Sequence, residues 1–100
     1  MKNRCYRFCS DAGHGWMVVP LKEIKKLGLT DKITQYSYIR GSNAYLEEDC
    51  DVTTFFKAAE QANIFPVLRD SKSMGVRQSR IRNYWSYNPS HVDWDTCKVR

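Results

Sequence analysis

The chain has 100 residues, 42% of them hydrophobic, and a formal net charge of +5. This length suits one domain with a small hydrophobic core, so residues 1–100 are expected to form a single domain. No apolar run approaches the roughly 20 residues of a membrane-spanning helix, and the N-terminus lacks the apolar stretch of a signal peptide. Both features predict a cytoplasmic protein with no membrane contact.

The first two predicted elements are strands that pair as a hairpin. Arg4 to Ser10 alternates two aromatic residues with cysteines and an arginine, and Trp16 to Val19 is a short apolar run. The segment between them, Asp11 to Gly15, contains two glycines and predicts a turn. Pro20 lacks an amide N–H, so it ends the strand and suits the first turn of a helix.

A short helix is predicted from Leu21 to Leu27, because its leucines and isoleucine recur at helical spacing. Gly28 follows at the position where helices take a left-handed residue, and Leu29 can pack back on Ile24 in a Schellman motif.

A second hairpin is predicted to join 33–40 to 43–48, followed by a helix. Gly41 suits the first central position of a type II′ turn, while a turn centred on Ser42 and Asn43 is the alternative. Both turns sort the side chains in the same way, because the face depends only on whether a position is odd or even. One face carries Tyr36, Tyr38, Arg40, Tyr45 and Glu47. The other carries Gln35, Ser37, Ile39, Ala44 and Leu46. Neither face is purely apolar, so the pattern leaves open which one is the core.

The helix after this hairpin is predicted over about residues 50–63. Its apolar stripe follows the i, i+3, i+4, i+7 pattern and consists of Val52, Phe55, Phe56, Ala59 and Ala62. Either Asp49 or Asp51 can cap its N-terminus, and Asn63 can take the left-handed position at its end.

The C-terminal third is less regular. Ile64 to Leu68 is apolar but contains Pro66, which predicts an edge strand or an extended connection. Asp70 to Ser79 is polar and predicts a loop, and Arg80 to Tyr87 is rich in residues that favour strands. Residues 88–100 are expected either to pack on this domain or to form a loosely packed tail.

The order of elements is β-β-α-β-β-α-β, which predicts an α+β fold. The expected architecture is an antiparallel sheet of four to six strands with two helices packed on one face.

The cysteines indicate neither a metal site nor a catalytic thiol. Cys5 and Cys9 would lie about 13 Å apart on a strand, too far to share one zinc ion, and no C-x-x-C pair is present. Cys50 lies near a predicted helix N-terminus, but the acidic residues beside it disfavour the thiolate. Two disulfides are conceivable with Cys97 as the fourth cysteine; without a signal peptide, reduced thiols are expected.

No convergent set of catalytic groups is visible either. Glu47, Glu48, Asp49 and Asp51 could in principle hold a divalent cation, but no glycine-rich phosphate loop accompanies them. The sequence therefore predicts a protein that is not an enzyme and that has no metal or cofactor.

The charge is unevenly distributed. Residues 41–68 have one basic and five acidic side chains, whereas the segments on either side are basic. Nucleic-acid binding would use the basic cluster Arg69, Lys72, Arg77, Arg80 and Arg82. Aromatic residues that could stack on bases follow directly. The alternative is that these aromatic residues belong to the core and that the arginines are only solvated.

Protein binding is the other function that the composition favours. Tyrosine, tryptophan and arginine predominate at interface hot spots. If the helices cover the opposite face of the hairpin, an aromatic face remains available to a partner. The acidic residues at its end would then steer a partner of opposite charge. The predicted interface consists of Tyr36, Tyr38, Arg40, Tyr45, Glu47 and Glu48.

The run GHGWMVVPLKEIKKLGLTDKI, followed by YSYIRGSNAYLEEDCD, resembles small uncharacterised proteins of phage and plasmid early regions over about residues 6–60. No established activity and no functional residues carry over from that resemblance. It implies a non-enzymatic ligand of a host protein or ribonucleoprotein complex, such as an inhibitor of restriction or CRISPR defences. The expected function is therefore docking on a host macromolecule in the host cytoplasm, with nucleic-acid binding through 69–82 as the alternative.

Overall fold

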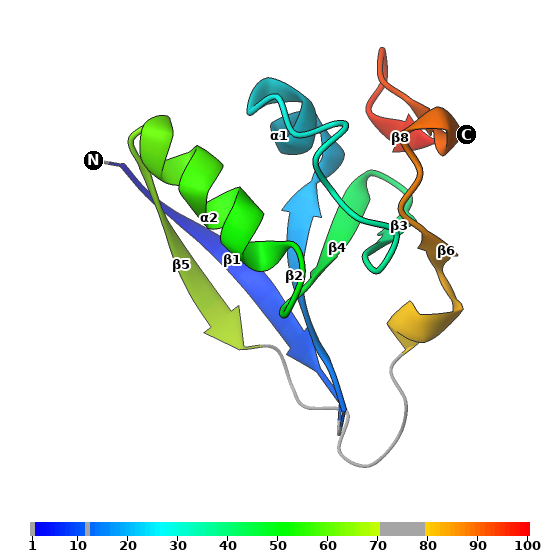
Figure 1. The fold of residues 1–100 in the computed structure, drawn as a ribbon, viewed down its shortest axis with the longest axis horizontal. Helices are drawn as coiled ribbons and strands as arrows, with labels where there is room; N and C mark the ends of the chain where they lie inside the picture. The colour runs from blue at the N-terminus through cyan, green and yellow to red at the C-terminus, as the bar shows by residue number, and fades with distance from the viewer. Residues whose placement is uncertain (1, 12, 71–79) are drawn as a thin grey trace.

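A computed structural model describes residues 2–11, 13–70 and 80–100, without the side chains of Asp70, Arg80 and Arg82. The fold is α+β (Figure 1). Its elements are β1 (Lys2–Ser10), β2 (Gly15–Pro20), α1 (Leu21–Lys26), β3 (Tyr38–Arg40), β4 (Asn43–Glu47), α2 (Val52–Gln61), β5 (Ile64–Asp70), a 3₁₀ turn η1 (Arg80–Asn83), β6 (Trp85–Ser86), a second 3₁₀ turn η2 (Pro89–His91), β7 (Val92–Asp93) and β8 (Lys98–Val99).

Six strands form a mixed sheet in the order β5-β1-β2-β4-β3-β6, and β7 and β8 form a separate pair. The other pairs in the large sheet are antiparallel, but β5 pairs with β1 in parallel, which departs from the expected antiparallel sheet. The reason is topological. β1 and β4 both run antiparallel to β2, and α2 carries the chain back across the sheet, so β5 runs in the same direction as β1. Pro66 lies on β5 at the edge of the sheet, as expected.

The two helices cover one face of the sheet, and this determines which side of the second hairpin is the core (Figure 1). Ile39, Ala44 and Leu46 are buried there in one apolar cluster with residues of both helices, such as Ile24 and Phe55. The tyrosines of the hairpin therefore lie on the opposite face.

Several local signals in the sequence are confirmed. Gly41 has a φ of 60°, and Arg40 pairs with Asn43, as a two-residue turn with glycine first requires. Gly28 has a φ of 72°, and the amide of Leu29 donates to the Ile24 carbonyl at 2.9 Å, which completes the Schellman motif. Asn63 takes the left-handed position after α2, with a φ of 60°.

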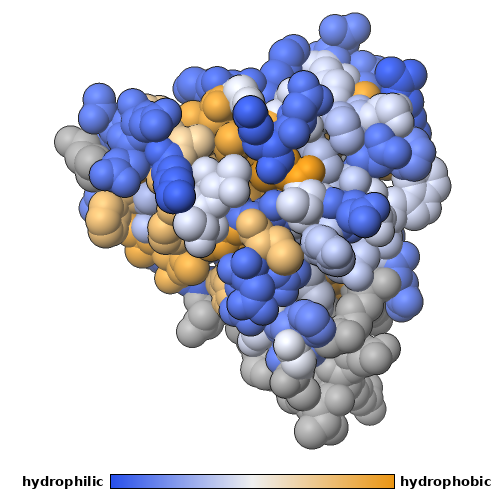
Figure 2. Space-filling model, viewed as in Figure 1, coloured by the Kyte–Doolittle hydropathy of each residue, from blue (hydrophilic) through white to orange (hydrophobic). Residues whose placement is uncertain are grey.

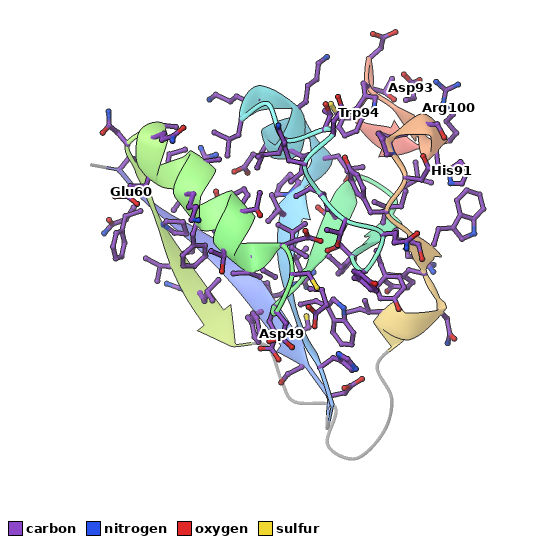
Figure 3. The ribbon with its side chains drawn as sticks, viewed as in Figure 1. Asp49, Glu60, His91, Asp93, Trp94 and Arg100 are labelled. Atoms are coloured by element: carbon purple, nitrogen blue, oxygen red, sulfur yellow. The ribbon has the colours of Figure 1, made fainter. Side chains whose placement is uncertain are left out.

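The C-terminal third differs from expectation. Arg80 to Tyr87 is not one strand, because it begins as η1 and only Trp85 and Ser86 pair with the sheet. Residues 88–100 are not a loose tail. Val92 is fully buried, the amide of Val99 donates to the Gly41 carbonyl at 2.7 Å, and Trp94 lies near α1 (Figure 3). The loop expected at 70–79 lies, after its first residue, outside the described residues.

Apolar side chains remain exposed along the edge strand β5, on both sides of the sheet. Phe65 and Leu68 of the edge strand β5 are 54% and 39% exposed. Apolar atoms gather in this region of the space-filling view, where Figure 1 draws β5 beside α2 (Figure 2). In the part of the chain that the structure describes, no helix is long and apolar enough to cross a membrane.

Candidate functional site

The candidate site lies on the sheet face opposite α1 and α2, here called the aromatic face. Strand register assembles it from the hairpin β3-β4 and from β2, which is distant from that hairpin in sequence. Val18 pairs with Tyr45 and Tyr45 with Tyr38, while in the next row Trp16 pairs with Glu47. Directly paired residues point to the same side of the sheet, so the two tyrosines and the tryptophan form a continuous surface.

One end of the aromatic face is built around Tyr45. The Tyr84 ring meets it edge-on with 5.0 Å between centroids, and the Arg40 guanidinium lies 4.9 Å from the centre of the Tyr84 ring. Burial raises the pKa of Tyr45, as does the nearby Tyr84, while the positive charge of Arg7 acts in the opposite direction. Tyr84 thus belongs to this surface, which the sequence did not indicate, because the packing of residues 80–84 over the sheet is a tertiary contact.

The other end of the aromatic face is hollowed into a cleft of about 520 Å³. Trp16 forms a wall with Tyr38, whose ring centroid lies 6.3 Å away at 62°, and the His14 ring stacks on Trp16 at 5.9 Å. Tyr36 stands at the rim and is 62% exposed. The lining residues are His14, Trp16, Gln35, Tyr36, Tyr38, Glu47, Asp49, Cys50 and Ser86. His14 and Trp16 were not among the predicted site residues, because the pairing of Trp16 with Glu47 and the approach of His14 to Glu47 are not encoded locally.

Glu47 lies inside this cleft and is only 7% exposed, so it is not one of the surface charges expected to steer a partner. The amide of Asp49 donates to its Oε2 at 2.7 Å, and His14 Nδ1 lies 3.5 Å from its Oε1. The amide of Glu47 itself donates to Ser37 Oγ at 2.9 Å. Position 47 is therefore held from both sides, and its carboxylate points into a partly enclosed space.

A buried hydrogen-bond network positions this end of the face. Asp51 is fully buried, and its carboxylate accepts from the Thr34 amide at 3.1 Å, from the Thr34 hydroxyl at 2.8 Å and from the Ser37 hydroxyl. These contacts hold residues 34–37 in a turn, so the strand expected from residue 33 begins only at Tyr38. They also explain why neither candidate aspartate caps α2 as predicted: Asp51 occupies the N-cap position, but its side chain makes no capping bond.

The remaining acidic residues and Cys50 are at the surface. Glu48 and Asp49 are exposed, and the Glu48 amide donates to the Gly15 carbonyl at 3.0 Å, which joins this end of β4 to the first hairpin. Burial raises the pKa of the Cys50 thiol, and the hydrogen bond and negative charge of Glu47 raise it further. A thiol whose pKa is raised forms less thiolate at neutral pH than an ordinary exposed thiol.

The five basic residues of the alternative site are only partly described. Lys72 and Arg77 lie outside the described residues, and for Arg80 and Arg82 only the backbone, in η1, is described. Arg69 is exposed on β5 and pairs with Arg7 of β1. Arg7 alternates with the core residue Tyr6, so both arginines lie on the side of the aromatic face.

Within the described ranges, no three His, Cys, Asp or Glu side chains come together as a metal site requires. No protein-family model, curated protein or solved structure matches this chain.

Proposed function

We propose that this chain is a small non-enzymatic binding protein that docks on a macromolecular partner through the aromatic face. The observation that supports this is the set of half-buried tyrosines, Tyr38, Tyr45 and Tyr84, with Arg40 beside them, on a sheet face that neither α-helix covers. Tyrosine and arginine that are already partly ordered provide large contact areas at low entropic cost, which is what interface hot spots require.

The charge along this face favours an oriented partner. Arg7 lies near Tyr45 and Arg40 over Tyr84, whereas Glu47 and Asp49 line the cleft at the other end. Such a polarised surface selects a partner with the opposite pattern and speeds its association. Glu48, although predicted for this interface, has its carboxylate beside Gly15 and Phe8 on the helix side of the sheet. The resemblance of residues 6–60 to phage and plasmid early-region proteins suggests the class of partner. We propose a host protein or ribonucleoprotein complex of a defence system, blocked by occupation of its surface.

The test is affinity purification from a bacterial lysate with and without nuclease, using matched charge reversals. Arg40→Glu places a negative charge on the aromatic face, whereas Lys57→Glu makes the same change on the exposed side of α2. We expect that a partner protein is captured by the wild type and by Lys57→Glu, also after nuclease treatment of the lysate. Arg40→Glu should no longer capture it. Equal capture by both variants would place the interface elsewhere.

Nucleic-acid binding is the second candidate, and one observation favours it. Arg7 and Arg69 are neighbours across β1 and β5, and no described carboxylate forms an ion pair with either. Two adjacent cations repel each other unless an anion such as a phosphate lies between them. This candidate requires that the protein shifts the electrophoretic mobility of single-stranded DNA, RNA or duplex DNA at about 50 mM salt. The affinity should fall less steeply with salt concentration in Arg7→Gln and in Arg69→Gln than in the wild type. A protein that shifts none of these under that condition does not act through nucleic acid.

A further inference from the structure

We infer that the cleft at the His14 end of the aromatic face binds a guanidinium group, supplied by an arginine side chain of the partner. The source of the arginine depends on the proposed function, but the chemistry of the cleft does not. The inference rests on three features of the cleft: aromatic walls, a buried carboxylate, and no lysine or arginine among the described lining residues.

The walls are rings that can stack on a flat cation. The rings that a ligand can reach are Tyr36, which stands at the rim and is 62% exposed, and the half-buried Tyr38. Trp16 is only 1% exposed and already stacks on His14; its ring meets Tyr38 at 62° with 6.3 Å between centroids and supports that wall from within. The negatively charged faces of tryptophan and tyrosine attract a cation placed over them, and the attraction is stronger where water is partly excluded.

Inside the cleft is a carboxylate with few strong donors. The Glu47 side chain is only 9% exposed, and its best donor is the Asp49 amide, which approaches Oε2 at 2.7 Å. Oε1 has His14 Nδ1 at the long distance of 3.5 Å, and the Cys50 thiol is a weak donor nearby. A carboxylate removed from water is unfavourable unless strong donors satisfy it, and a guanidinium carries five N–H donors.

Among the residues that the structure describes, no lysine or arginine lines the cleft, and its carboxylates are those of Glu47 and Asp49. A bare metal ion does not fit, because no three suitable ligands converge in the described residues. An ammonium group is compact and strongly hydrated, whereas a guanidinium is planar, weakly hydrated and able to stack and donate at the same time. The volume of about 520 Å³ lies within the range of side-chain and small-ligand sites.

The inference can be tested with the free ligand and the intact chain, without any partner. N-acetyl-arginine amide is titrated into the ¹⁵N-labelled protein while the Trp16 indole and the Glu47 and Asp49 amides are followed by NMR. The matched control ligand is the citrulline derivative, which has the same shape but no charge. We expect saturable shifts confined to the cleft with the arginine compound, weaker shifts with the lysine compound, and none with the citrulline compound.

Two variants identify the groups responsible. Glu47→Gln keeps an oxygen for the Asp49 amide but removes the charge, and it should weaken arginine binding about tenfold or more. Tyr36→Ala removes the exposed ring at the rim and should weaken binding a few-fold without affecting the core. Glu60→Gln, an exposed glutamate on α2, is the matched control and should bind like the wild type.

Equal shifts with the citrulline compound, or unchanged affinity in both Glu47→Gln and Tyr36→Ala, would overturn the inference. The result is separable from the proposed function. A cleft that binds arginine in a protein that captures no partner refutes the docking proposal alone, while a captured partner with an inert cleft refutes only the guanidinium site.

Discussion

The contacts of Asp51 predict that this side chain is a principal stabiliser of the fold. Three donors converge on it, the Thr34 amide, the Thr34 hydroxyl and the Ser37 hydroxyl, and they join the start of α2 to the segment that leads into β3. Ser37 is fully buried, so its hydroxyl has no access to water when the carboxylate is removed, whereas Thr34 is exposed and can be rehydrated.

The magnitude follows from this difference. A buried donor left without an acceptor costs about 1–3 kcal/mol, and a hydrogen bond to a charged group contributes about 1.5–3 kcal/mol. Counting Ser37 in full and Thr34 in part, Asp51→Ala should lower the free energy of unfolding by about 3 kcal/mol. In a domain of this size that corresponds to a fall in Tm of roughly 15 °C. Asp51→Asn keeps one acceptor oxygen and should lower the free energy of unfolding by only about 1–2 kcal/mol.

Urea unfolding followed by circular dichroism measures both variants. Asp31→Ala, an exposed aspartate in the segment between α1 and β3, is the control and should change stability by under about 0.5 kcal/mol. In a double-mutant cycle with Ser37→Ala, the loss in the double variant should be clearly smaller than the sum of the single losses. An Asp51→Ala variant within about 1 kcal/mol of wild type would show that the network does not stabilise the fold.

Three further outcomes are expected. Burial raises the pKa of both Tyr6 and Tyr87 above the ordinary value of 10.0. The stability that the two protonated hydroxyls contribute is therefore complete below about pH 10 and is lost as the pH rises above it. Between pH 8 and 11, the Tm of Tyr6→Phe should fall less than the Tm of the wild type. Cys50 should react with iodoacetamide more slowly at pH 8 than an ordinary exposed thiol, and Glu47→Gln should speed the reaction, as peptide mass spectrometry can measure; an unchanged rate in Glu47→Gln would contradict the assigned contact. Gly41→Ala meets no atom within 4 Å of the added methyl group, yet the φ of 60° should cost about 1 kcal/mol in urea unfolding, so an unchanged midpoint would contradict the turn geometry.

Local signals in the sequence were sufficient for the helices, the turns and the edge strand in the first two thirds of the chain, but not for the elements after residue 80. Gly28 and Gly41 occupy positions where only a residue tolerant of positive φ fits well, and Asn63 ends α2 for the same reason. Pro66 marked the edge strand, because a central strand would need its missing amide. Each of these features depends on a few consecutive residues, so sequence alone carries them.

The site depended on the tertiary structure. Alternation divided the second hairpin into two sets of side chains, but only the placement of α1 and α2 decided that Ile39 belongs to the core and Tyr38 to the aromatic face. The sequence suggested a surface charge at Glu47. Its side chain is buried because Trp16 pairs with Glu47 across the strands and His14 approaches its carboxylate from the first hairpin. These contacts join positions more than thirty residues apart, and no local pattern encodes them, because the pairing of distant strands is selected by the packing of the whole sheet.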